Sequence, residues 1–174
     1  MARIETLQRL RELITDYGPR GAAKIRDHIC EQGEAFIARA PFALLGTLGD
    51  HGLEISPKGG TPGFVAMLDN RTLLIPEYAG NHLAIGLGNI LRDSRVALLL
   101  MRPATDEVLR ISGRASLHDD ADLCEVHGAG GKPAILVIRI EVERAAFHCV
   151  RSARRAGLWN PASWDASTSM AFSQ

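Results

Sequence analysis

The sequence carries no excess charge of either sign, and this excludes several classes of partner. Its 174 residues contain 20 Lys plus Arg and 20 Asp plus Glu, so the formal net charge at pH 7 is zero. Nucleic-acid-binding domains usually have a strongly basic overall charge or a basic stripe. We therefore expect no nucleic-acid partner. A charged fraction of 23% also argues against a disordered acidic segment.

Long hydrophobic runs are absent as well. The apolar stretches at 96–101 and 134–138 are far shorter than the roughly 20 residues that cross a bilayer. The first 18 residues alternate charged residues with Leu and Ile, unlike the uninterrupted apolar core of a signal peptide. These features predict a soluble, cytoplasmic protein with no membrane partner.

Cysteine is scarce, with Cys30, Cys124 and Cys149 at widely separated positions. An odd number at this spacing is typical of reduced, buried thiols rather than of a secreted disulfide framework. Cys124 and His127 have a spacing that zinc ligands use, but one short pair does not make a site, and we predict no metal. A chain of this length can bury roughly 70% of its unfolded surface as one domain.

Helical periodicity is clearest near the N-terminus. Apolar residues recur at three- and four-residue intervals from Ile4 to Tyr17, before the helix stop Gly18-Pro19. A second helix is expected over about 22–40, although Gly33 is a candidate break. Shorter helices are expected over residues 83–91, 119–127 and 151–157. Gly86 and Gly88 in the first of these favour either close approach of a ligand or partner, or an irregular helix.

Six runs of alternating or β-branched residues predict strands. They cover residues 42–49, 53–57, 71–76, 95–101, 107–117 and 135–150. The continuous apolar run at 95–101 indicates a strand covered on both faces. Strands without regular βαβ alternation exclude a doubly wound fold and favour an antiparallel barrel with peripheral helices. The predicted fold class is therefore mainly β, of the α+β type.

Two segments carry residues suited to an anionic or aromatic ligand. Ser56-Pro57-Lys58 is followed by two glycines, so that backbone amides and an ammonium can converge on an anion. The alternative is a turn with a solvated lysine. Near the C-terminus, a cluster of arginines that includes Arg155 precedes Trp159, whose ring can cover a planar ligand. The alternative there is a solvated basic helix with one packed Trp.

Taken together, SPKGGTPGFVAMLDNRTLLIPEYAGN (56–81), the Asn89-Ile90-Leu91 that follows, and FHCVRSARRAGLWNP (147–161) resemble the FMN-binding, pyridoxamine 5′-phosphate oxidase-related family. The resemblance runs from about residue 37 to 161. It implies a six-stranded antiparallel split β-barrel of the FMN-binding type that forms a homodimer with FMN at the subunit interface. We expect N-terminal helices packed on the barrel (1–40), the barrel domain (41–161) and a C-terminal tail (162–174).

The same resemblance implies a set of cofactor-binding residues. Ser56, Pro57 and Lys58 would lie beside the flavin, and the segment 81–89 around its phosphate and ribityl chain. Ile75 and Pro76 would edge the ring, whereas Arg155 and Trp159 would lie near the second subunit's cofactor. The full set is Ser56, Pro57, Lys58, Ile75, Pro76, Asn81, His82, Leu87, Asn89, Arg155 and Trp159. No catalytic residue can be assigned as a proton donor.

The resemblance predicts an FMN-dependent oxidoreductase acting on a small-molecule substrate or electron donor, with the chemistry carried by the flavin. The most similar subgroup has basic or polar residues at the positions of Leu83, Ile85 and Gly88, so a phosphate would rely on Lys58, His82, backbone N–H groups and any arginine from elsewhere in the dimer. The tail ASWDASTSMAFSQ has no Arg or His, unlike the substrate motif of the true pyridoxamine 5′-phosphate oxidase, and oxidation of vitamin B6 is not expected. The alternatives are a non-enzymatic flavin or tetrapyrrole binding module, and a dimeric scaffold with a decayed pocket.

Overall fold

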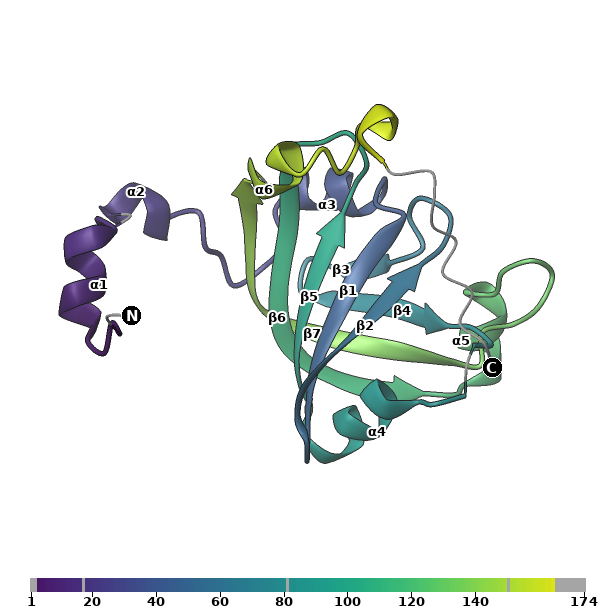
Figure 1. Ribbon diagram of the computed structural model, residues 1–174. Helices are drawn as coiled ribbons and strands as arrows, with labels where there is room; N and C mark the ends of the chain where they lie inside the picture. The colour runs from purple at the N-terminus through teal and green to yellow at the C-terminus, as the bar shows by residue number, and fades with distance from the viewer. Residues whose placement is uncertain (1–2, 17, 81, 150, 165–174) are drawn as a thin grey trace.

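The computed structural model describes residues 3–16, 18–80, 82–149 and 151–164 (Figure 1). A seven-stranded antiparallel sheet, in the order β2-β1-β5-β6-β7-β4-β3, curls around the main hydrophobic core. The strands are β1 (Phe42–Gly49), β2 (Gly52–Gly59), β3 (Ala66–Asp69), β4 (Thr72–Glu77), β5 (Arg95–Met101), β6 (Glu107–His118) and β7 (Leu136–Cys149). The helices are α1 (Leu7–Leu13), α2 (Gly18–Ala22), α3 (Glu31–Ile37), α4 (Ile85–Arg92), α5 (Ala121–Val126) and α6 (Arg151–Arg155), followed by a 3-10 turn (Pro161–Ser163).

Alternation along the strands sends one set of side chains into the barrel. Leu45 of β1, Leu98 of β5 and Ile111 of β6 are all buried in one cluster. Phe36 of α3 joins this cluster, and its ring meets that of Phe147 on β7 edge-on, with 5.5 Å between the ring centroids. Burial of apolar surface is the dominant favourable term in folding. The core therefore fixes which face of each strand remains outside.

The sequence predicts six strands, and the described residues form seven. The additional strand, β3, has four residues and pairs antiparallel with β4, with a register shift between Met67 and Asp69. A strand this short shows too little alternation to be recognised from its pattern. The mainly β class and the antiparallel split-barrel architecture are confirmed.

The helix predicted over 22–40 is wrong in its extent, because between Ala22 and residue 40 only α3 is helical. Arg26 and Ala145 of β7 exchange two backbone hydrogen bonds, of 3.0 and 2.8 Å, so the chain is extended there. Pairing with a strand far away in the sequence outweighs the local helical periodicity at this point. Gly33 lies inside α3 and does not break it.

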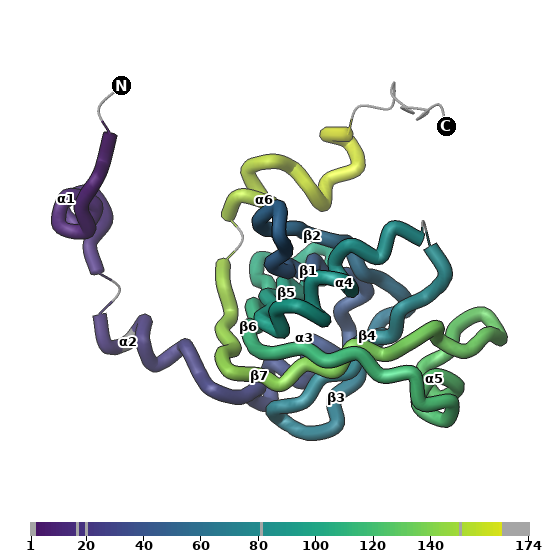
Figure 2. The backbone as a smooth tube through the Cα atoms, turned by 90° about the horizontal axis from the view of Figure 1, so that it is seen from below, coloured from purple at the N-terminus to yellow at the C-terminus, as the bar shows by residue number. Residues whose placement is uncertain are grey.

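The first predicted helix is present as α1, which begins after Thr6, whose Oγ1 accepts a hydrogen bond from the Arg9 backbone N–H. Its apolar residues are exposed, with Leu7 at 68% and Leu13 at 56%. Figures 1 and 2 show α1 and α2 standing away from the barrel. In the single chain, α3 is thus the N-terminal helix that packs on the barrel. Nowhere in the described part of the chain is a helix long and apolar enough to cross a membrane.

Helix α4 lies across one end of the barrel, at the bottom of Figure 1. Asn89 is buried in this helix and donates its Nδ2 to the Oγ1 of Thr47 on β1 at 3.1 Å. Gly49 makes room for this contact, since a Cβ at that position would overlap the Asn89 amide. The helix is therefore held against β1 by a buried side-chain hydrogen bond.

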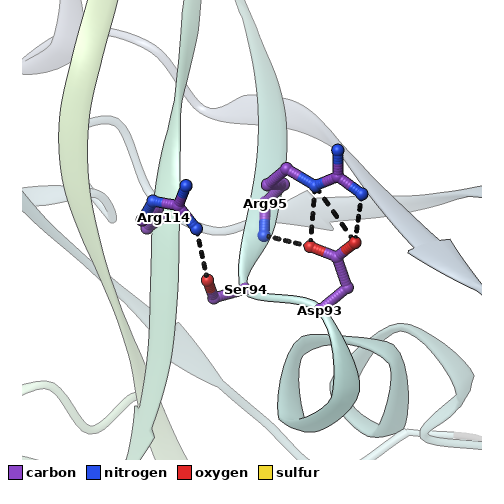
Figure 3. A network of polar contacts seen from close by, with 4 residues as sticks. All are labelled: Asp93, Ser94, Arg95 and Arg114. Atoms are coloured by element: carbon purple, nitrogen blue, oxygen red, sulfur yellow. Dashed lines mark hydrogen bonds and ion pairs between the residues drawn. The ribbon is translucent and has the colours of Figure 1, made fainter.

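The C-terminal end of α4 is fixed by the polar network in Figure 3. The Asp93 carboxylate accepts hydrogen bonds from the backbone N–H of Arg95 at 3.0 Å and from its Nε at 2.9 Å. The Arg95 side chain, followed by its backbone N–H, lowers the pKa of Asp93 to about 2. Arg114 of β6 donates to the Ser94 hydroxyl in the same turn. The start of β5 is thereby tied to both α4 and β6.

Candidate functional site

The first candidate site lies where β2, β4 and α4 meet. Ser56 and Lys58 of β2 are opposite Leu45 and Ala43 of β1 in the register, so they belong to the core-facing side of the sheet. Only 12% of the Lys58 side chain is exposed, and its Nζ donates to the Glu77 carboxylate of β4 at 2.5 Å. The predicted cation is therefore present, and a carboxylate that the sequence motif did not reveal already compensates its charge.

The first turn of α4 supplies backbone donors to the same place. Gly86 faces Ser56, because a Cβ on Gly86 would lie 3.5 Å from the Ser56 Oγ. The helix begins after Ala84, which has a positive φ of 48° and provides no side-chain cap. His82, two residues earlier, also has a positive φ, 59°. Uncapped helix N-termini and such strained non-glycine residues are common at ligand sites.

Asn81, which the resemblance places in the cofactor site, lies outside the described residues. The N-cap position of α4 belongs to Ala84. His82 is exposed, and Leu87 is half-buried against the main core. The Asn89 amide is engaged with Thr47. Of the expected phosphate-binding segment, the backbone of the first helical turn is thus the part best placed to meet a ligand.

Other predicted residues take no part in these contacts. Ile75 is completely buried in the main core, and Pro76 beside it on β4 is buried too. Pro57 is exposed on the opposite face of β2 from Ser56. Arg155 is exposed at the end of α6, and Trp159 beyond it is half-buried. Figure 1 places α6 at the top of the barrel and α4 at the bottom. One chain therefore does not bring α6, which ends at Arg155, next to α4.

The outer face of β1, β2 and β5 forms an apolar surface that is largely exposed in the described part of the chain. Leu53 and Ile55 of β2 are 83% and 68% exposed. Leu44 of β1 is directly opposite Leu99 of β5, and both are only partly buried. The expectation that residues 95–101 are covered on both faces is therefore wrong for the single chain, because Ala97 on the outer side is exposed. Alternation alone could not show that these outward residues line up across three strands.

A groove of about 680 Å³ crosses this outer face and continues onto β6 and β7. Its floor includes Leu44, Ala97 and Leu99. Its basic lining residues are Lys24, Arg110, Arg144 and His148. None of the described residues that line the groove is Asp or Glu. The groove is therefore an apolar surface with a positively charged margin, and no sequence motif pointed to it.

Sulfur and histidine chemistry is sparse in the described residues. Cys124 is buried, as predicted for a reduced thiol, whereas Cys30 is only partly buried and Cys149 is exposed. Within the described ranges, no three His, Cys, Asp or Glu side chains form a cluster that would hold a metal ion. In this part of the chain, Cys124 and His127 therefore have no third side chain with which to hold a metal ion.

Comparison with known proteins defines the class to which this barrel belongs. The family model described as pyridoxamine 5′-phosphate oxidase matches residues 29–149, more than half of the chain. The chain is a member of the pyridoxamine 5′-phosphate oxidase family. A search of curated proteins found no match.

Solved structures share the fold at low sequence identity. HupZ of Group A Streptococcus is 21% identical, with a TM-score of 0.54 over 71% of this chain and 95% of that chain. General Stress Protein 26 of Bacillus anthracis is 14% identical, with a TM-score of 0.53 over 66% and 88%. A Clostridium acetobutylicum protein related to general stress protein 26, of the pyridoxinephosphate oxidase family, is 11% identical, with a TM-score of 0.53 over 68% and 87%. These likenesses establish the split-barrel fold.

Proposed function

We propose that the chain is an FMN-binding flavoprotein that works as an FMN-dependent oxidoreductase on a small-molecule substrate or electron donor. Membership of the pyridoxamine 5′-phosphate oxidase family supports flavin chemistry. The observation that carries the proposal is the first turn of α4, which Ala84 does not cap with its side chain and which faces Ser56, on the same face of β2 as Lys58. Backbone N–H groups at a helix N-terminus, beside a hydroxyl and an ammonium, are suited to an anionic cofactor group.

The donor set fits a phosphate, with one cost. The N–H groups of the first turn of α4 and the Ser56 hydroxyl would donate to phosphate oxygens, while Gly86 leaves space beside Ser56. Lys58 would share its charge between the phosphate and Glu77, which holds its Nζ at 2.5 Å. Bound FMN would supply a two-electron acceptor, whereas the protein would orient it and exclude water. The Lys58 and Glu77 pair supports binding less strongly than a free lysine would.

We infer that the working unit is a homodimer in which a second copy covers the outer face of β1 and β2. Leu53 and Ile55 are too exposed on this face for a surface with no partner. The wide separation of α6 from α4 within one chain (Figure 1) also favours this arrangement, because Arg155 and Trp159 would then serve the second copy's cofactor.

The absorption spectrum of the purified protein tests the proposal. We expect the visible absorption bands of bound flavin, with FMN recovered after acid release, or uptake of added FMN by colourless protein. Lys58→Gln should weaken FMN binding, and the matched Lys132→Gln in the exposed loop before β7 should not. A colourless protein that takes up no FMN would contradict the proposal.

The non-enzymatic flavin or tetrapyrrole binding module remains the second candidate. The ion pair between Lys58 and Glu77 favours this binding module. Lys58 is the only cation of the Ser56-Pro57-Lys58 segment, and its charge is already compensated by Glu77. Flavin that stays oxidised with NADH and NADPH, and that supports no oxidase turnover, would favour a binding module over an enzyme.

A further inference from the structure

Helix α1 has an apolar stripe that its own barrel leaves uncovered. Leu7, Leu10 and Ile14 have the three- and four-residue spacing that places side chains on one side of a helix. All three are exposed, and α1 contributes no buried residue. Arg9 and Glu12 lie on the opposite side of the helix, where they pair with each other at 2.6 Å. The polar side of α1 is therefore satisfied locally, whereas the apolar stripe is exposed to water in the described chain.

A helix as short as α1 needs a surface to pack on. It has seven residues, and isolated helices shorter than about 12–15 residues are marginal in water, because most helical stability in proteins comes from the packing of an apolar face. Figures 1 and 2 show α1 and α2 away from the barrel of the same chain. We therefore expect the surface that stabilises α1 to belong to another molecule.

The N-terminal arm, which consists of α1, α2 and the residues up to Ile25, begins beside the face that we assign to the second copy. At Arg26 the chain is fixed to its own barrel by two backbone hydrogen bonds to Ala145 of β7. Just before this point, Gly21 and Ile25 line the groove of the outer sheet face together with Ile55 of β2. A second copy seated on that face therefore lies next to the base of the arm.

The charge of the arm favours a protein partner over a lipid surface. Residues 3–16 carry three basic and three acidic side chains, so this segment has no net charge. Helices that lie on anionic membranes are usually rich in Lys and Arg on their polar face. A balanced polar face with a short apolar stripe is instead suited to a protein surface, and a second copy of this chain provides exposed apolar residues beside the arm.

We propose that the two copies of the dimer exchange their N-terminal arms. The apolar stripe of α1 from each copy packs on the barrel of the second copy, at the margin of the interface. Two-fold symmetry makes the two contacts identical. This exchange rests on the homodimer inferred above, and it adds a contact outside the sheet face. Because α1 contributes no buried residue to its own barrel, the barrel folds whether or not the arm is docked.

Photo-crosslinking of mixed dimers tests the exchange. Leu10→p-benzoylphenylalanine places a photoreactive side chain in the stripe, and dimers are assembled from isotopically light and heavy copies of this variant. We expect crosslinked peptides that join a light chain to a heavy chain. The matched Gln8→p-benzoylphenylalanine, exposed on the polar side of α1, should give far fewer. Crosslinks that stay within one chain, or no crosslinks from position 10, would overturn the proposal.

The affinity of the dimer gives a second measurement. Leu10→Glu places a charge in the stripe, and we expect the dissociation constant of the dimer to rise about tenfold or more, because the burial of one leucine side chain is lost. Analytical ultracentrifugation measures this constant. The matched Gln8→Glu adds the same charge to the polar side and should dimerise like the wild type. A dimer as tight in Leu10→Glu as in the wild type would also overturn the proposal.

Light scattering on the same samples separates the possible failures. A dimer whose crosslinks stay within one chain overturns the exchange and leaves the homodimer standing, whereas a monomer overturns both. Binding of the protein to phosphatidylserine vesicles with loss of the crosslinks would assign the stripe to a membrane surface and overturn the exchange. Flavin content decides the proposed cofactor independently of these results.

Discussion

Gly113 shows how a single residue sets the shape of the barrel. It lies where the register of β6 and β7 shifts, between Ser112 and Gly113. A Cβ at this position would overlap the backbone carbonyl oxygen of Glu141, an atom that cannot rotate away. Glycine therefore permits the close approach of two backbones at the point where the long strands bend.

We expect Gly113→Ala to destabilise the protein by about 1–3 kcal/mol, the usual cost of overpacking. Urea unfolding followed by circular dichroism measures this difference. Gly46→Ala is the matched control, because it is also in a strand and its added Cβ would lie 3.5 Å from the nearest atom, an ordinary contact. Equal stability of the two variants would show that the bend at Gly113 tolerates a side chain.

Asp93 gives a second prediction, in pH dependence. Its folded pKa, about 2, lies below the ordinary value of 3.8 because of Arg95, so its contribution to stability is full above about pH 4 and is lost as the pH falls toward 2. Asp93→Asn should lower the Tm at pH 7 by no more than a few degrees, as for other exposed ion pairs. The difference from the wild type should disappear near pH 2. Asp119→Asn, at an exposed residue, is the control, and a difference that persists at pH 2 would contradict the assignment.

At the scale of elements, what the sequence predicts well is local. Six strands follow from alternation, and α4 follows from apolar spacing, because both patterns are complete within a few residues. The helix predicted over 22–40 fails because Arg26 pairs with Ala145, a contact that no local pattern reveals. For the same reason the sequence singles out Lys58 as a candidate but does not reveal its ion-pair partner Glu77.

The attachment of α4 to β1 leads to a prediction about this element. Asn89→Ala removes the donor to the buried Thr47 hydroxyl, and we expect a loss of about 1–3 kcal/mol. If the first turn of α4 holds the cofactor phosphate, FMN affinity should fall in parallel with stability. Thermal unfolding and FMN titration of the same preparations measure both. Arg92→Ala, at the exposed last residue of the helix, should change neither by as much. Undiminished stability in Asn89→Ala would show that other contacts hold the helix.

At the scale of the whole molecule, the apolar outer face is the property least visible in the sequence. Leu53 and Ile55 become one surface with Leu44 and Leu99 only through the register of three strands. That register is set by the core on the other side of the sheet. A strand pattern can show that residues alternate, but which neighbour each one meets depends on the whole barrel.

The proposed homodimer is tested by reversing the character of this face. Leu53→Glu places a charge in the interface, and we expect size-exclusion chromatography with light scattering to show a monomer. Leu68→Glu is the matched control, since Leu68 is 63% exposed on β3, at the opposite edge of the sheet. A dimer that survives Leu53→Glu and dissociates in Leu68→Glu would place the interface on the other edge.

The strand order also determines when the molecule can fold during synthesis. β4 pairs with β3 and β7, while β1 pairs with β2 and β5. The two hairpins made first are therefore joined only through β5, β6 and β7, and β7 is the last strand of the sheet to leave the ribosome. Until then the edge of β4 and the apolar residues beneath it stay open. Until β7 is made, the nascent chain therefore exposes apolar surface and an unpaired strand edge, which make partly folded chains prone to aggregate, and we expect a truncation before β7 to give an unstable product.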